Sequence, residues 1–303
     1  MKILFDIVIV SYNAGDKLCR TLQSVLTQEG VAAQNDTDYR VIVKDGASTD
    51  ASVADAKRLL DEMPEEIKQR VRLLQEADAG IYDAMNRALD ALSEAWKPAG
   101  EAADTDEKHL VYFINCGDTL ASDDVLRSVA DGARTFYNKQ ETVPELPAIF
   151  YGDVIEDLTG ERVASNPRMD DFALYRHVPC HQACFYDAAL FVKERFDTSL
   201  RVRADYDHFL KSFYHYHALC IYLPLAVAHY EGGGFSETEE NRKRSAIEHR
   251  KVLRRYMDET MIRRFDRRMK LTLQPLRTKL AENPETAGFY NALRRMLYRM
   301  KGE

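Results

Sequence analysis

Short apolar segments rich in β-branched residues alternate along this sequence with segments of helical periodicity, and this alternation limits the fold most. Between the first two apolar segments, Leu18, Leu22 and Leu26 recur at helical spacing. The predicted strands are residues 3–10, 39–44, 71–75, 109–115 and 149–154, and the predicted helices are residues 18–26, 53–60, 82–95 and a segment after Ser122. This βαβα order predicts an α/β fold, in which helices cover a parallel sheet and ligands bind at the carboxyl ends of its strands.

The later sequence is organised differently. Residues 97–108 (KPAGEAADTDEK) are polar and lack periodicity, which predicts a surface loop. Residues 180–230 predict short strands at 184–186, 219–223 and 226–230 around a helix at 206–214. From Glu239 onward the sequence is helical and basic. Since 303 residues suffice for one large domain or two smaller ones, we expect a catalytic domain over 1–238 and a basic helical extension over 239–303.

Several classes of protein are excluded by what the sequence lacks. No apolar run is long enough for a transmembrane helix, and residues 1–10 read as a strand rather than a signal peptide. These observations predict action in the cytoplasm or at its membrane face. The five cysteines are scattered, and Cys180 and Cys184 lack the second pair that a zinc site needs, so free thiols are expected. Neither a P-loop nor a dinucleotide-binding glycine motif occurs.

Two acidic residues follow predicted strands, each with a glycine beside it. Asp45 closes one strand in KDGASTD, and Asp118 follows another in YFINCGD. Taken alone, either residue also fits an Asx-turn or a helix cap. Together at the carboxyl ends of one parallel sheet, they suit a divalent cation held mainly by the phosphates of a ligand, because Mg²⁺ takes oxygen donors and few protein ligands.

Four motifs in order carry a resemblance to a known family. They are FDIVIVSYNAGDKLCRTLQSVLTQ, VIVKDGASTD, EADAGIYDAMNRAL and YFINCGD. The sequence from residue 5 to about 236 resembles the family 2 inverting glycosyltransferases, and most of all their bacterial subgroup that builds capsule, exopolysaccharide or O-antigen. The resemblance implies the GT-A fold, a Rossmann-like, mostly parallel central sheet flanked by helices.

The resemblance also implies a set of residues that bind the nucleotide sugar, with a UDP-sugar as the favoured donor. They are Ser11, Tyr12, Asn13, Asp45, Asp78, Asp83, Asn86, Asn115, His181 and Gln182. Asp118 would bind Mg²⁺ or Mn²⁺, although this chain has Asn-Cys-Gly-Asp where the family carries Asp-x-Asp. His229, in AHYEGGGFS, matches a histidine that completes the metal or diphosphate site in related enzymes, and a structural role is the alternative.

Inverting sugar transfer is a single displacement, so it needs one carboxylate to take the proton of the acceptor hydroxyl. The segment RADYDHFL resembles the family's helix start that carries this base, with Asp205 aligned to it and Asp207 in reserve. The alternative is a helix N-terminus that favours acidic residues through its dipole.

The charge is divided unevenly along the chain. Residues 239–303 contain 18 Lys and Arg against 9 Asp and Glu, whereas residues 1–238 contain 24 against 40. Clusters at 263–270 and 294–301, with apolar residues such as Ile262 and Phe265 between the charges, predict basic amphipathic helices at an anionic membrane surface. A helical pair packed on the acidic body, or a homodimer, is the alternative. The lack of a nucleic-acid reading motif argues against nucleic acid.

These observations predict an inverting glycosyltransferase that moves a sugar from a nucleoside diphosphate sugar to a glycan or lipid-diphosphate-linked acceptor in surface polysaccharide biosynthesis. A sugar nucleotidyltransferase is one alternative, but it needs a glycine-rich basic loop that SYNAGDKLCR does not supply. A non-catalytic glycan-assembly protein that keeps the fold is the other.

Overall fold

The computed structural model describes residues 1–31, 36–93, 96, 107–139, 146–232, 238–271 and 286. The chain divides into two compact units, residues 1–252 and 253–303. Within the described residues, no helix combines the length and apolarity needed to cross a membrane.

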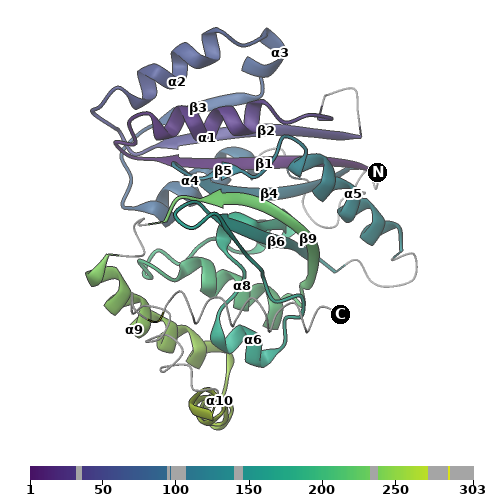
Figure 1. Ribbon diagram of the computed structural model, residues 1–303, viewed down its shortest axis with the longest axis vertical. Helices are drawn as coiled ribbons and strands as arrows, with labels where there is room; N and C mark the ends of the chain where they lie inside the picture. Colours follow the sequence, from purple (N-terminus) through teal and green to yellow (C-terminus); the bar gives the residue numbers. More distant parts are fainter. Residues whose placement is uncertain are drawn as a thin grey trace. The chain divides into compact units, whose positions relative to one another are not determined.

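The first unit is built on one curled sheet (Figure 1). Its strands are β1 (Lys2–Ser11), β2 (Thr37–Asp45), β3 (Val71–Gln75), β4 (Glu107–Asn115), β5 (Thr119–Leu120), β6 (Ala148–Glu156), β7 (Glu161–Val163), β8 (Cys184–Asp187) and β9 (Leu219–Tyr230). The order is β3-β2-β1-β4-β8-β6-β9-β5, with β7 paired to β6. Strands β3, β2, β1 and β4 are parallel, and β6 is parallel to β9, while β8 runs antiparallel to β4 and β6. The predicted α/β fold with a mostly parallel sheet is thereby confirmed.

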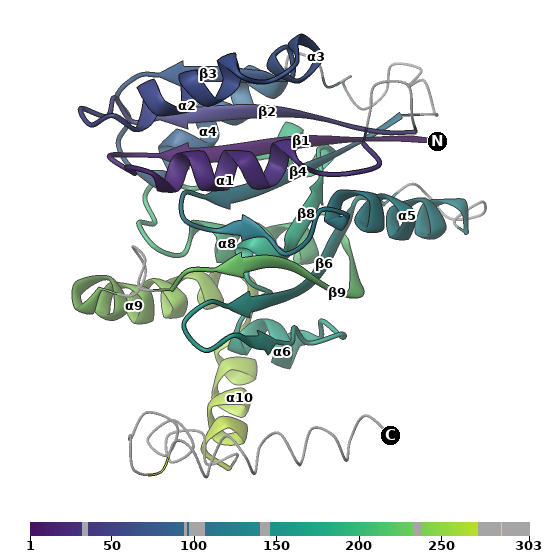
Figure 2. The same ribbon diagram turned by 45° about the horizontal axis from the view of Figure 1, so that its top comes forward.

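Helices cover the sheet because the apolar face of each helix packs against apolar side chains of the strands. The helices of this unit are α1 (Lys17–Leu26), α2 (Ser52–Asp61), α3 (Glu65–Lys68), α4 (Ile81–Ser93), α5 (Val125–Asn138), α6 (Asp171–Arg176), α7 (Ala189–Lys193), α8 (Ala204–Tyr214) and most of α9 (Glu239–Tyr256), with a 3₁₀ turn at His181–Ala183. Leu18, Leu22 and Val25 of α1 share one core with alternate residues of β1, such as Phe5 and Ile7. Helices α2 and α5 pack into the same core (Figures 1 and 2), and α4 packs on β1 and β2.

The predicted strand pair at 219–223 and 226–230 is wrong, because both segments belong to the single strand β9. Pro224 interrupts the apolar run in the sequence but does not end the strand. The register of β9 with β6 shifts between Tyr222 and Ala226, around this proline. Proline lacks an amide hydrogen and is tolerated at such irregularities. The predicted loop at 97–108 also ends early, because β4 begins at Glu107; residues 97–106 lie outside the described residues.

The second unit contains the end of α9 and the helix α10 (Glu259–Leu271). Ile262 and Phe265 are buried, so these two apolar side chains are not presented to a membrane as the sequence suggested. The exposed basic residues of α10, here called the basic patch, are Arg263, Arg264, Arg267, Arg268 and Lys270. The second predicted cluster, 294–301, lies outside the described residues.

Candidate functional site

The carboxyl ends of four parallel strands form one edge of the sheet. Ser11 at the end of β1 is in register with Asp45 at the end of β2, and Asp45 is in register with Gln75 of β3. On the other side of β1, Val10 is in register with Asn115. The residues predicted from strand ends therefore meet at one edge, as parallel strands require.

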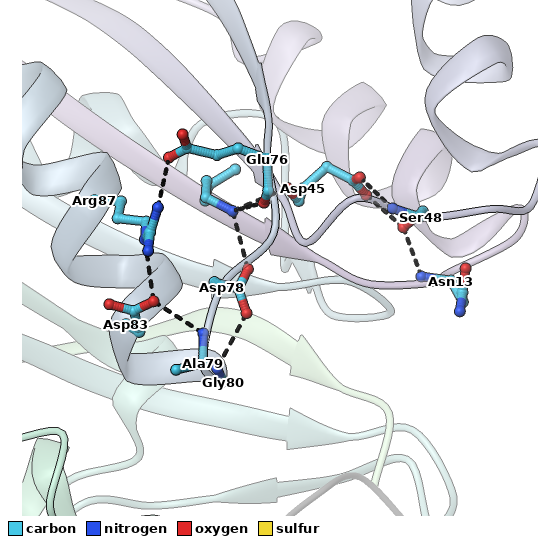
Figure 3. A network of polar contacts seen from close by, with 10 residues as sticks. Asn13, Asp45, Ser48, Glu76, Asp78, Ala79, Gly80, Asp83 and Arg87 are labelled. Atoms are coloured by element: carbon cyan, nitrogen blue, oxygen red, sulfur yellow. Dashed lines mark hydrogen bonds and ion pairs between the residues drawn. The ribbon is translucent and has the colours of Figure 1, made fainter.

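The loops after β1 and β2 are joined by short polar contacts (Figure 3). Asp45 is buried, and its carboxylate accepts hydrogen bonds from the Ser48 amide at 2.7 Å and the Ser48 hydroxyl at 2.5 Å. The Asn13 amide donates to Ser48 Oγ at 2.7 Å, and Asn13 Oδ1 accepts from the Thr49 amide at 3.0 Å. Asp45 thus makes the Asx-type turn that was the alternative to ligand contact. The Tyr12 ring between these loops is 70% exposed.

A buried lysine organises the loop that precedes α4. The Lys44 ammonium has no exposed surface and donates to the Asp45 carbonyl at 2.9 Å, the Glu76 carbonyl at 2.7 Å and the Asp78 carboxylate at 2.9 Å. A buried ammonium needs such partners. Asp78 also accepts from the Gly80 amide at 3.1 Å. Lys44 thereby fixes the backbone that carries the predicted donor-binding residues.

Two further predicted residues of this loop and α4 make structural contacts. Asp83 accepts from the Ala79 amide at 2.9 Å and from Arg87, and this backbone hydrogen bond lowers the pKa of its carboxyl (Figure 3). Asn86 pairs with the backbone of Phe196, donating to its carbonyl at 2.9 Å and accepting from its amide at 3.0 Å. These two side chains therefore hold loops in place.

Asp118 follows β4 in a tight turn that Gly117 makes at a φ of +107°. The Asp118 carboxylate is 4% exposed and accepts from the Gln182 amide at 2.7 Å and the Glu231 backbone amide at 3.0 Å. Burial raises its pKa, and the nearby carboxylates of Glu231 and Asp157 raise it further. Asn115 Oδ1, three residues earlier, is buried with no hydrogen-bond partner among the described residues.

Charged residues from α1 and the end of β9 surround this turn. The Glu231 carboxylate lies 2.6 Å from Lys17 Nζ and 3.7 Å from Arg20. His229 lies opposite Thr119 in the sheet, and its Nδ1 is 2.8 Å from the Asp157 carboxylate. His229 is thus paired with an acid near Asp118.

The described residues fit a cation that a bound diphosphate helps to hold. They contain no group of three or more His, Cys, Asp or Glu side chains that could enclose a metal by itself. Asp118 does supply one buried carboxylate, with the carboxylates of Glu231 and Asp157 nearby. Because Mg²⁺ is commonly bound by one or two carboxylates plus substrate phosphates, this arrangement suffices.

Asp205 and Asp207 both lie in the first turn of α8, but their surroundings differ. Asp207 is 4% exposed, whereas Asp205 is partly exposed. The Tyr82 hydroxyl donates to Asp205 Oδ1 at 2.9 Å, and burial keeps the pKa of Tyr82 well above its usual range, so the hydroxyl stays protonated. Of the two, Asp205 is the carboxylate with more surface exposed to solvent.

The 3₁₀ turn at 181–183 contacts Asp118 and experiences the charge of Asp205. Gln182 bonds Asp118, whereas His181 packs against the Phe113 ring with centroids 5.2 Å apart. Neither His181 nitrogen has a hydrogen-bond partner among the described residues, and burial lowers its pKa. Burial raises the pKa of the adjacent Cys180 to about 12, and Asp118 and Asp205 both add to the rise.

Sequence reasoning missed three of these residues. Lys44 had a signal, a charge inside an apolar strand. Tyr82 was visible only as part of a motif. Glu231 had no signal, because its role depends on contacts with Lys17 and Asp118 that lie far away in the sequence.

Comparisons with known proteins relate the chain to glycosyltransferases. Residues 6–96 match the model of Glycosyl transferase family 2. The chain is 29% identical over 237 residues to a PGL/p-HBAD biosynthesis glycosyltransferase of Mycobacterium tuberculosis (strain ATCC 25177 / H37Ra), which is 78% of this chain and 80% of the relative. The counterpart in Mycobacterium bovis (strain BCG / Pasteur 1173P2) gives the same values. Over residues 6–96 the chain is thus similar to glycosyltransferases of family 2, and over most of its length to two named glycosyltransferases.

Solved structures share the fold. The mannosyltransferase PcManGT from Pyrobaculum calidifontis, solved with GDP-Man and Mn²⁺, matches 95% of this chain and 73% of its own at a TM-score of 0.57 and 15% identity. S. aureus TarS 1–349 with UDP-GlcNAc matches 88% of this chain and 70% of its own, at 0.56 and 15%. In two further TarS structures the chain spans 60% and 42% of the solved chain. These likenesses agree with a GT-A fold.

Proposed function

We propose that this protein is an inverting glycosyltransferase that moves a sugar from a nucleoside diphosphate sugar to a glycan or lipid-diphosphate-linked acceptor. The observation that carries the proposal is a pair of carboxylates in different surroundings. Asp118, after β4, is buried and bonded to Gln182 of the 3₁₀ turn, whereas Asp205, at the start of α8, is partly exposed and bonded to the Tyr82 hydroxyl. Asp118 suits the diphosphate side, and Asp205 suits the acceptor side.

The chemistry assigned to the chain is a single displacement. Asp205 takes the proton of the acceptor hydroxyl, whose oxygen attacks the anomeric carbon while the bond from that carbon to the diphosphate oxygen breaks. Tyr82 orients the Asp205 carboxylate through its hydrogen bond. Mg²⁺ or Mn²⁺, when bound at Asp118, would neutralise charge on the leaving diphosphate.

Donor recognition is assigned to the edge formed by β1, β2 and the loop before α4. The exposed Tyr12 ring offers a stacking surface for a nucleobase. The turn fixed by Asp45 and the loop fixed by Lys44 present backbone groups around it. A UDP-sugar remains the favoured donor, and the solved complexes of TarS with UDP-GlcNAc and PcManGT with GDP-Man define the set to test.

We further propose that the basic patch of α10 holds the enzyme at the anionic cytoplasmic face of a membrane, where a lipid-linked acceptor would be found. The patch is exposed. Of the apolar residues on this helix, Ile262 and Phe265 are buried and Leu271 is exposed, so we propose a contact that is mainly electrostatic. Surface polysaccharide biosynthesis is the context that we propose for this reaction.

Thermal shift with UDP-Glc, UDP-GlcNAc and GDP-Man, each with and without Mn²⁺, tests the function, because a bound donor stabilises the fold by mass action. We expect one donor to raise the Tm in a Mn²⁺-dependent way and to release its nucleoside diphosphate. Asp118→Asn should lose the Mn²⁺-dependent rise, while Asp123→Asn, an exposed acid nearby, should keep it. Asp205→Asn should bind donor and lose at least about 100-fold in turnover. Release of pyrophosphate instead would overturn the proposal.

A further inference from the structure

A carboxylate from α9 binds the backbone amides of the segment that leads into α8. Glu248 is 7% exposed, and its two oxygens accept hydrogen bonds from three successive backbone amides, those of Arg201 at 2.9 Å, Val202 at 2.9 Å and Arg203 at 3.0 Å. Successive amides of this kind make an anion-binding concavity. Here the anion is a side chain of the same protein, 45 to 47 residues along the sequence.

The segment held by Glu248 ends at Arg203, directly before α8 and two residues before Asp205. The Tyr82 hydroxyl lies 2.8 Å from the Val202 carbonyl and 2.9 Å from Asp205 Oδ1 and shares its one hydrogen between these two acceptors. Val202 is therefore held on its amide side by Glu248 and on its carbonyl side by Tyr82. The position of this peptide segment fixes where α8 begins, and with it where the Asp205 carboxylate points.

Two other contacts join α9 to this segment and to the start of α8. Arg203 Nε donates to Ser245 Oγ at 2.8 Å, one helical turn before Glu248. The His249 ring lies on the Tyr206 ring of α8 with centroids 5.0 Å apart. Because Glu248 makes charge-assisted bonds to three amides, we regard it as the main restraint among these contacts.

We propose that Glu248 is a positioning residue that holds Asp205 in its reactive geometry, an inference that rests on the proposed role of Asp205 as the base. Helix α9 lies in the part of the sequence expected to form a separate extension, yet it supplies this contact to the site. A displacement of about 1 Å at a reacting group can cost about 100-fold in rate. Loss of Glu248 should therefore lower kcat without changing how the donor binds.

The test uses the full chain and the UDP- or GDP-sugar that gives the largest Mn²⁺-dependent thermal shift, with release of its nucleoside diphosphate as the readout. Glu248→Gln keeps the shape of the side chain but replaces one acceptor oxygen with a donor. We expect a 10- to 100-fold fall in kcat with an unchanged donor KM. Glu240→Gln is the matched control, because Glu240 lies on the same helix, is exposed and pairs only with Arg244 at 3.4 Å among the contacts described. Its kcat should stay at the parent value.

Rescue and coupling separate positioning from simple stabilisation. Glu248→Asp, which keeps the charge, should recover part of the lost kcat, and it carries the test if Glu248→Gln does not fold. Tyr82→Phe and Glu248→Gln should combine to less than the product of their separate effects, because both act through one segment. A kcat that is unchanged in the folded fraction of both Glu248 variants would overturn the inference.

The base assignment is tested independently of this inference. If Asp205→Asn keeps full turnover, the proposed role of Asp205 fails, whatever Glu248 does. If Asp205→Asn abolishes turnover and the Glu248 variants turn over normally, only the positioning role fails.

Discussion

The Tyr82 hydroxyl lies 2.9 Å from a carboxylate oxygen of Asp205, although the two residues are 123 positions apart in the sequence. Tyr82 is the second residue of α4, and Asp205 lies in the first turn of α8. This contact joins the half of the sheet that carries the proposed donor-binding loops to the helix that carries the candidate base.

Removal of this hydroxyl should affect the chemical step most. In Tyr82→Phe the Asp205 carboxylate loses a hydrogen bond that, for a charged acceptor, is worth about 1.5–3 kcal/mol. We expect kcat for nucleoside diphosphate release to fall about 10- to 100-fold, with little change in donor KM. Tyr214→Phe is the control, because Tyr214 donates to Asp171 at 2.8 Å near the other end of α8. Equal losses in the two variants would contradict the assignment.

The sequence predicts the parts of this site that depend on local patterns. The buried runs that become β1 and β2 and the acids that end or follow strands are visible because strand period and turn chemistry act over a few residues. The contacts of Glu248 and Tyr82 are not visible, because each depends on how helices far apart in the sequence pack together. The short strands β5 and β7 were missed for a different reason, because two or three residues carry no periodicity.

Gly117→Ala should weaken donor binding through the turn that carries Asp118. A methyl group at Gly117 would lie 2.4 Å from Glu231 Oε2, and the φ of +107° disfavours any side chain. Gly160→Ala is a matched control, since its φ is +64° and no atom lies within 4 Å of the new methyl group. Both variants should lose at least about 1 kcal/mol of stability. Calorimetric titration of UDP with Mn²⁺ should show weaker binding for Gly117→Ala alone, and equal affinities would refute this role.

His208 should make the protein less stable in mild acid. Burial lowers its pKa to about 3, whereas an unfolded histidine titrates near 6.5, so between these values the unfolded state binds a proton that the folded state excludes. The free energy of unfolding then falls with decreasing pH, by up to about 1.4 kcal/mol per pH unit. Urea unfolding at pH 7.5 and pH 5 measures this effect. Between these two pH values, the free energy of unfolding of His208→Phe should fall by about 2 kcal/mol less than that of the parent protein.

Phenylalanine is a suitable replacement for His208 because the imidazole ring is stacked on another aromatic ring. The His208 ring lies 4.2 Å from the Phe191 ring at an interplanar angle of 7°, a stack that phenylalanine can keep. His217→Asn serves as the control, because His217 is exposed and its φ of +54° suits asparagine. The control should retain the pH dependence of the parent protein. If His208→Phe also retains it, the buried imidazole is not the source.

The basic patch should bind anionic membranes through charge alone. Each Lys or Arg near such a surface contributes about 1 kcal/mol, so replacing Arg263, Arg264, Arg267 and Arg268 with Gln should weaken binding to phosphatidylglycerol-containing vesicles at least about 100-fold. Because Ile262 and Phe265 are buried, binding should also fall steeply with salt and be absent with phosphatidylcholine alone. Cosedimentation measures all three effects. A variant with four exposed cations of the first unit replaced, Lys57, Arg58, Arg72 and Arg127, has the same net charge and should bind like the parent. Equal losses in the two variants would mean that net charge, and not the patch on α10, governs the contact.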